Sequence, residues 1–312
     1  MKKIILFLVI TLCSLSQSFG QFKMPKTEDF KLVNKLPIVV LLKTEKDEND
    51  IQYNKFVKKY VEEFFGAERV HAFLNFKEFN KFIKDKSNKN KFSFIGYEYV
   101  INRNPSKGLT MEGIDYVNVH QIFLGICGKN FMTNYGYLSA IVYPDGQKNL
   151  LKKKEKFTID ESLMKFALTY FKNQINDVLS GDEASFTYSL SDLNKNASNL
   201  KNLTLLVDKN IVDEKFLEDL KKNYSYKFEI VDSERIKKAI LENENGVAFF
   251  HNHFQPMASR QFANLLHIYQ ASDLRVLYFT LPENNSKLQI GKQKLIVDDR
   301  KDYVEKLNSI IE

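Results

Sequence analysis

The chain has 312 residues, of which 44% are hydrophobic, 27% charged and 13% aromatic. A disordered protein carries too few apolar side chains to offset the entropy lost on ordering, so this composition excludes that class. With about 150 residues in an average domain, the length predicts two domains.

The charge distribution argues against a nucleic-acid partner. The formal net charge is +7, and lysines outnumber arginines by 40 to 6. Proteins that bind nucleic acid favour arginine, because its guanidinium group contacts phosphates and base edges through paired hydrogen bonds. The arginines here are scattered, at positions 69, 103, 235, 260, 275 and 300. We therefore interpret the lysines as a solvated surface.

The first 20 residues have the pattern of a signal peptide. Two lysines and a short apolar run follow Met1, and Ser18-Phe19-Gly20 has small residues at both positions that a signal peptidase reads, which predicts cleavage before Gln21. Leu12 precedes Cys13, which disfavours a lipid anchor. No later segment reaches the roughly 20 apolar residues of a transmembrane helix. We expect an exported protein, periplasmic or extracellular.

The cysteine content favours export from a bacterium. Cleavage before Gln21 would leave one cysteine, Cys127, whereas secreted domains of higher organisms usually carry several disulfides. Cys127 ends the apolar stretch 121–127, which predicts a buried and unreactive thiol.

An N-terminal arm over 21–37 leads to the first of two similar series of elements. An apolar strand is predicted over 38–42, and a helix follows with Phe56, Tyr60 and Phe64 on one face. A strand over 69–74 comes next. Asn75 then begins a helix, with Glu78 three residues on, as in a capping box. A strand over 92–95 completes a βαβαβ order.

The same order recurs in the second half of the chain. An apolar strand lies over 201–208, followed by a helix with Phe216 and Leu220 on its buried face. A strand over 226–231, a helix capped by Ser233 and a strand over 247–250 follow. This order favours a parallel sheet covered by helices in each half.

The ends of the halves match at a constant offset of 138 residues. The segments 140–145 and 278–283 correspond, and so do the acidic pairs Asp160-Glu161 and Asp298-Asp299. Each pair is expected to open a closing helix, because carboxylates stabilise helix N-termini. Between these matches we predict a long crossover over 102–135 in the first half. In the second half we predict a helix with its core face formed by Phe262, Leu265, Leu266 and Tyr269.

The predicted fold is therefore α/β, with two tandem, duplicated βαβαβ-type units over 38–180 and 203–312, each ending in a β-hairpin and a helix. A polar linker over 181–202 joins them. The strands over 38–42 and 203–207 are expected to be central and buried, because neither alternates polar with apolar residues. The order of elements is similar to that of the thioredoxin fold, although the chain has no Cys-x-x-Cys motif, which excludes redox activity of that type.

No complete catalytic or nucleotide-binding motif occurs. Gly128-Lys129 lacks the upstream glycine and the following hydroxyl residue of a phosphate-binding loop. The segment 162–165 fits Ser-x-x-Lys, but no Lys-Thr-Gly follows it. A His-Glu-x-x-His motif, a Gly-x-Ser-x-Gly motif and an EF-hand loop are likewise absent from the sequence.

One constellation could carry chemistry. His251 and His253 end the apolar run that starts at Val247, and two residues apart on a strand they point the same way. With Arg260 at the start of the next predicted helix, they could bind an anion or another ligand. A zinc site would need His267 as its third ligand. The competing interpretation is that these histidines are solvated or cap a strand end; the equivalent first-half residues are Gly96 and Glu98.

Three functions stay open on these observations. The first is a non-catalytic envelope protein that binds or assembles with another envelope protein or a small ligand, without a cofactor. The second is a metal-dependent hydrolase centred on His251 and His253. The third is a two-lobed solute-binding protein with its ligand between the halves, since clefts between domains commonly hold ligands.

Overall fold

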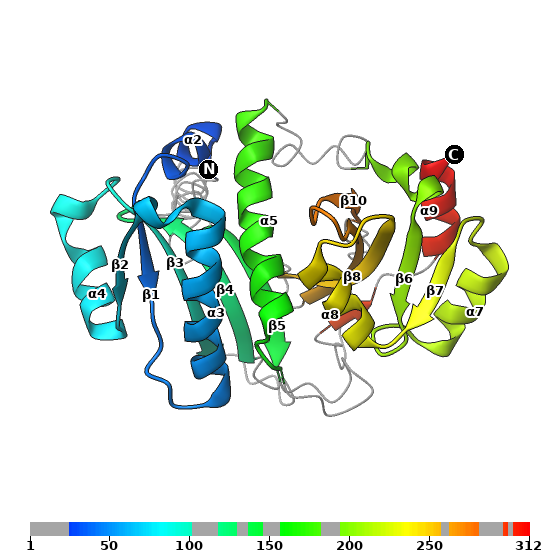
Figure 1. Ribbon diagram of the computed structural model, residues 1–312, viewed down its shortest axis with the longest axis horizontal. Coiled ribbons are helices and arrows are strands. Elements are labelled where there is room, and N and C mark those ends of the chain that lie inside the picture. Colours follow the sequence, from blue (N-terminus) through cyan, green and yellow to red (C-terminus); the bar gives the residue numbers. More distant parts are fainter. Residues whose placement is uncertain are drawn as a thin grey trace, which may run out of the picture.

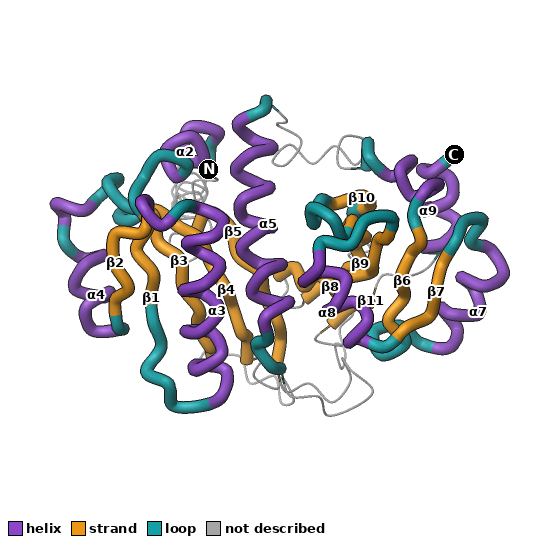
Figure 2. The backbone as a smooth tube through the Cα atoms, in the orientation of Figure 1, coloured by secondary structure: helices purple, strands orange, loops and turns teal. Residues whose placement is uncertain are grey.

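The computed structural model describes residues 25–101, 118–129, 137–145, 157–181, 194–256, 262–280, 296–298 and 302–312. Within these residues the strands form two mixed sheets, one in each half of the chain. Helix α5 (Glu161–Leu179) lies between the two sheets (Figure 1, Figure 2). The predicted signal peptide lies outside the described residues.

The first sheet has the strand order β2-β1-β3-β4-β5. Strand β1 pairs in parallel with β2 and β3, whereas β3, β4 and β5 are antiparallel neighbours. All residues of β1 are buried, because helices cover both faces of the sheet at this strand. The elements of this half are α2 (Thr27–Val33), β1 (Ile38–Leu41), α3 (Glu48–Phe65), β2 (Val70–Leu74), α4 (Phe76–Lys84), β3 (Ser93–Ile101), β4 (Asn118–Ile126), β5 (Tyr137–Asp145) and α5.

The second sheet repeats this arrangement, with the order β7-β6-β8-β9-β10 and β11 beside β9. Strand β6 is parallel to β7 and β8, and β8, β9 and β10 are antiparallel. The elements are β6 (Thr204–Asp208), α7 (Glu214–Asn223), β7 (Phe228–Val231), α8 (Ser233–Glu242), β8 (Val247–Pro256), β9 (Phe262–Gln270), β10 (Val276–Tyr278), β11 (Ile296–Asp298) and α9 (Tyr303–Ile311).

The shared strand order and directions confirm the predicted pair of duplicated α/β units with central, buried strands β1 and β6. The helix predicted around Leu265 and Leu266 is wrong, because this segment is strand β9. Its residues 265–269 are buried on both faces, so apolar side chains occupy nearly every position and also satisfy a helical spacing. The predicted likeness to the thioredoxin fold included this helix. What remains of that likeness is the βαβαβ start, the antiparallel strands and the closing helix.

Two helix starts follow the sequence signals and two do not. Asn75 and Glu78 form the predicted capping box of α4, and Asp160 accepts a hydrogen bond from Leu163 N at the start of α5. Helix α8 has Asp232 rather than Ser233 at its N-cap position. The second acidic pair does not open α9: Asp298 ends β11, and α9 begins at Tyr303. The first-half hairpin is formed by β5 with β4, which lies inside the segment expected to be a crossover.

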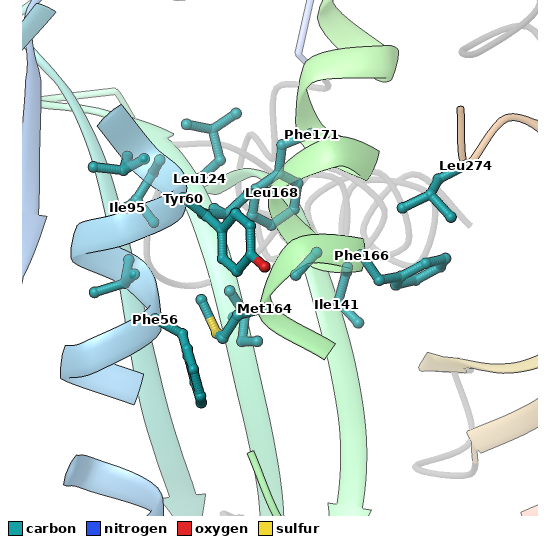
Figure 3. Packing of buried hydrophobic residues seen from close by; sticks show 14 of the residues in the cluster. Phe56, Tyr60, Ile95, Leu124, Ile141, Met164, Phe166, Leu168, Phe171 and Leu274 are labelled. Atoms are coloured by element: carbon teal, nitrogen blue, oxygen red, sulfur yellow. The ribbon is translucent and has the colours of Figure 1, made fainter. Parts of the chain in front are cut away.

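The largest hydrophobic core is continuous across both halves. It combines buried residues of α2, α3, α5 and the first sheet with Ile236, Ala239 and Ile240 of α8 and Phe249 and Tyr269 of the second sheet. Figure 3 shows how residues from α3 and the first sheet converge on one side of α5. A separate core covers the far face of the second sheet under α7 and α9, and a third lies between α4 and the first sheet. Cys127 belongs to this third core, and burial raises the pKa of its thiol to about 12, as predicted for an unreactive cysteine.

Equivalent backbone hydrogen bonds align the two units. Cys127 N donates to Phe92 O in the first, and Ala271 N donates to Val247 O in the second. Counting along the strands from these bonds shows that Gly96 occupies the position equivalent to His251, and Phe123 the position equivalent to His267. The two units therefore fill the same place in the sheet with different side chains.

The first unit closes this place with its own aromatic side chain. A Cβ atom on Gly96 would lie 2.3 Å from Cζ of Phe123, so the ring occupies the volume where the second unit has an imidazole. We expect Gly96→Ala to lower the free energy of unfolding by about 1–3 kcal/mol through overpacking. Urea unfolding checks this, and Gly96→Ala/Phe123→Leu should recover part of the loss. A Gly96→Ala variant as stable as the wild type would contradict the close packing.

Candidate functional site

The three histidines named from the sequence come together on one face of the second sheet. His251 and His253 alternate with Asn252 on β8, and β9 places His267 directly opposite His251. Because side chains two apart and side chains opposite each other share a face, all three imidazoles lie on the same side. His267 is fully buried, and the rings of His253 and His267 are stacked with centroids 4.9 Å apart.

The first half of the chain supplies two further rings of this cluster. Phe166 of α5 stacks on His251 with centroids 4.2 Å apart, and Tyr143 of β5 meets His251 edge-on at 6.3 Å. Phe166 lies on the side of α5 that faces away from Phe56 and Tyr60 (Figure 3). The sequence placed Phe166 on the apolar side of its helix, but nothing in its spacing indicated a partner from the other half.

We call the contact of α5 and β5 with α8, β8 and β9 the junction. Three polar ties accompany its apolar packing. Lys165 Nζ donates to Leu241 O at 2.7 Å, Lys237 Nζ lies 3.0 Å from Asp160, and Asn173 Nδ2 donates to Asp273 O at 3.0 Å. Lys165 thus places a cation on a carbonyl at the C-terminal end of α8, where the helix dipole favours positive charge.

Removing this cation should weaken the junction. We expect Lys165→Met to lower the free energy of unfolding by about 1–2 kcal/mol, because the Leu241 carbonyl loses a charged donor. Lys58→Met, at an exposed position of α3, is the matched control and should change stability by less than about 0.5 kcal/mol. Equal stabilities of the two variants in urea would show that the Lys165 tie contributes nothing.

Burial keeps the three histidines uncharged at neutral pH. Burial lowers the pKa of His251 to about 3, with a smaller contribution from His253, and it lowers the pKa of His253 to about 4. The pKa of His267 is also well below its ordinary value, again chiefly through burial. Among the described residues, no ion pair includes any of these rings.

Several buried polar atoms of the cluster have no hydrogen-bond partner among the described residues. They are Nδ1 of His251, Nδ1 of His267, the Tyr143 hydroxyl and Oγ1 of Thr280. The other nitrogen of His267, Nε2, lies 3.3 Å from the carbonyl oxygen of Thr280. A neutral His267 that donates from Nε2 keeps a lone pair on Nδ1 that no described residue contacts.

The surroundings of the site differ from those expected. His251 and His253 lie on a central strand beyond its last pair with β6. The prediction that they end this strand is wrong, because β8 continues to Pro256 through its pairing with β9 and leaves both histidines near its middle. The helix predicted after β8 is strand β9 instead. The helix N-terminus that we expected to bind an anion is therefore not formed by this segment. Arg260 lies outside the described residues. Within the described part of the chain, no group of three or more histidine, cysteine, aspartate or glutamate residues is arranged to hold a metal ion.

A second cluster of aromatic rings, built around the single histidine His120, lies in the first sheet and was missed by sequence reasoning. The Tyr97 hydroxyl is 2.6 Å from Nδ1 of the buried His120, and Tyr99 and Phe157 pack against the same imidazole. Phe157 also contacts Tyr143, so ring contacts run from this cluster to the junction. The only sequence signal was the alternation of Tyr97 and Tyr99 on one strand.

Comparisons with known proteins give no match: no family model, curated protein or solved structure is similar to this chain. None of the described helices is both long enough and apolar enough to cross a membrane.

Proposed function

We propose that this chain is an exported, non-catalytic binding or assembly component of a bacterial envelope, built from a duplicated α/β unit. The observation that supports this most is the packing of His251, His253 and His267 as uncharged rings in the junction. A general acid or base needs a pKa near the working pH, and the pKa values of these rings lie well below pH 7. They contribute to the contact between the halves.

The shared core counts against a solute-binding cleft. A protein that binds its ligand between two lobes needs an open space between them in the free form. Here a continuous set of buried side chains joins α5 to α8 and the second sheet. A hydrolase centred on His251 and His253 stays as the alternative, with zinc as its cofactor, and metal analysis separates it from the proposed function.

Export is tested by the N-terminus of the protein from its native host. We expect the mature chain to begin at Gln21, because the small residues at Ser18 and Gly20 fit signal-peptidase cleavage. N-terminal sequencing of protein recovered outside the cytoplasmic membrane checks this. Recovery of the full-length chain in the cytoplasm would overturn both the cleavage and the envelope location.

Binding is tested by crosslinking in the native host and purification through a C-terminal tag. We expect a complex of constant stoichiometry with another envelope protein or a retained small ligand. The variant His251→Phe/His253→Phe, which keeps the ring packing, should retain the same complex. A protein recovered alone, with a hydrolytic activity that this variant loses, would contradict the proposal and support the alternative.

A further inference from the structure

The three histidines lie where the halves of the chain meet. His251 stacks on Phe166 of the first half, His267 stands opposite His251, and His253 stacks on His267. Tyr269 on β9 also packs edge-on against Phe166, at 4.9 Å. The three imidazoles therefore belong to the face of the second sheet that α5 and β5 cover.

Among the described residues, no carboxylate pairs with these imidazoles, and no hydrogen-bond partner stands beside Nδ1 of His251 or Nδ1 of His267. A protonated imidazole donates from both nitrogens, yet Nδ1 of His251 and Nδ1 of His267 are buried and have no described partner. A charged N–H group in that position would be buried without an acceptor or a counterion, which is strongly unfavourable.

The charged and titratable groups of the surrounding elements do not relieve this. The ones whose contacts place them at the junction are Asp160, Lys165 and Tyr170 on α5, Tyr143 on β5, Lys237 on α8 and Tyr269 on β9. Asp160 is paired with Lys237 and accepts from Ser162, and the ammonium group of Lys165 is bound to Leu241 O. The tyrosines are uncharged, and the lysines would repel the positive charge of a protonated histidine.

We infer that the junction is acid-sensitive: when the histidines take up protons, α5 and β5 separate from the histidine face before either sheet unfolds. Each sheet keeps its own cover in the separated state. Helices α3 and α5 stay on the first sheet, and α7 and α9 stay on the second. The inference does not depend on what the chain binds.

The size of the effect follows from linkage. A histidine released from the junction returns to an ordinary pKa near 6.5, far above the values that burial imposes on His251 and His253. At pH 5 each such histidine therefore favours the separated state by about 30-fold relative to neutral pH. Two such histidines together shift the equilibrium toward the separated state by about 1,000-fold, which is enough to open a junction held by a few kcal/mol.

The chain contains no tryptophan, so a single introduced indole reports on one place without background. We would make three variants of the mature chain, each with one tryptophan. Tyr170→Trp reports on the junction, Phe65→Trp on the core beside α3 in the first half, and Tyr224→Trp on the core under α7 and α9. On lowering the pH from 7.5 to 4, the Tyr170→Trp emission should shift at a higher pH than the other two. Coincident transitions at all three positions would overturn the inference.

Two further variants show which groups are responsible. Adding His251→Phe to Tyr170→Trp should move the junction transition to lower pH by about half a unit or more, because one of the protonated groups is gone. Lys237→Met, which removes the ion pair across the junction, should weaken the contact at every pH and keep its pH dependence. An unchanged midpoint with His251→Phe would overturn the role of the histidines.

The unmodified mature chain provides a measurement that needs no substitution in the junction. Small-angle scattering should show a larger radius of gyration at pH 5 than at pH 7.5, while far-ultraviolet circular dichroism stays the same. A radius that remains constant until the dichroism itself collapses would contradict separation ahead of unfolding.

Discussion

Phe166→Ala is expected to lower the free energy of unfolding by about 3–5 kcal/mol, the range typical of a large aromatic side chain removed from a core. The ring is 2% exposed and contacts His251, Phe249 and Tyr269, all from the other half of the chain. Its loss leaves a cavity beside these three rings. Thermal and urea unfolding of the variant measure this directly.

Phe76→Ala is the matched control. Phe76 is 58% exposed at the start of α4, so its removal should change stability by less than about 0.5 kcal/mol. If Phe166→Ala were as mild as Phe76→Ala, the junction would not be a stabilising contact, and the shared core would not hold the halves together.

Acidification from pH 7.5 to pH 5 is expected to cost about 2 kcal/mol for each of His251 and His253. The folded chain lowers the pKa of His251 to about 3, below its unfolded value of 6.5. The unfolded state therefore binds more protons between these two values. Stability is complete above about pH 6.5 and is lost progressively as the pH falls toward 3.

The series of variants isolates the groups responsible. His251→Phe keeps a ring against Phe166 and should flatten the pH dependence of the urea midpoint below pH 6.5. His71→Gln is the control, because His71 is exposed on β2, and it should leave the profile unchanged. A wild-type profile that stays flat from pH 7.5 to pH 5 would show that the histidines are not buried as described.

The βαβαβ start of each unit was predictable because its signals are local. Buried central strands such as β1 and β6 appear in the sequence as continuous apolar runs. The capping box formed by Asn75 and Glu78 indicates the start of α4. These patterns depend on a few neighbouring residues, so sequence spacing alone specifies them.

The antiparallel strands were harder to predict. Strand β9 is buried on both faces, so its residues 265–269 lack the alternation that distinguishes a strand from a helix. The segment forms a strand because it pairs with β8 along its length. Such pairing depends on tertiary structure and cannot be inferred from the spacing of neighbouring residues. Strand β4 was missed within a long glycine-containing segment for the same reason.

The candidate site was half predictable. The spacing of His251 and His253 placed both imidazoles on one face, and the register of β8 and β9 then brought His267 beside them. The contribution of Phe166 and Tyr143 could not be foreseen, because it depends on how the first unit packs on the second. The contrast between Gly96 and His251 at equivalent positions reflects that packing: the first unit fills this place with Phe123, and the second unit packs against α5.

The central claim is that the histidine cluster contributes to the junction and is not a catalytic metal centre. Metal analysis of the protein, purified from its native host without chelators, tests this most directly. We predict much less than one equivalent of zinc or another transition metal per chain, both in the wild type and in His251→Ala/His253→Ala. One equivalent in the wild type that is absent from the variant would contradict the claim.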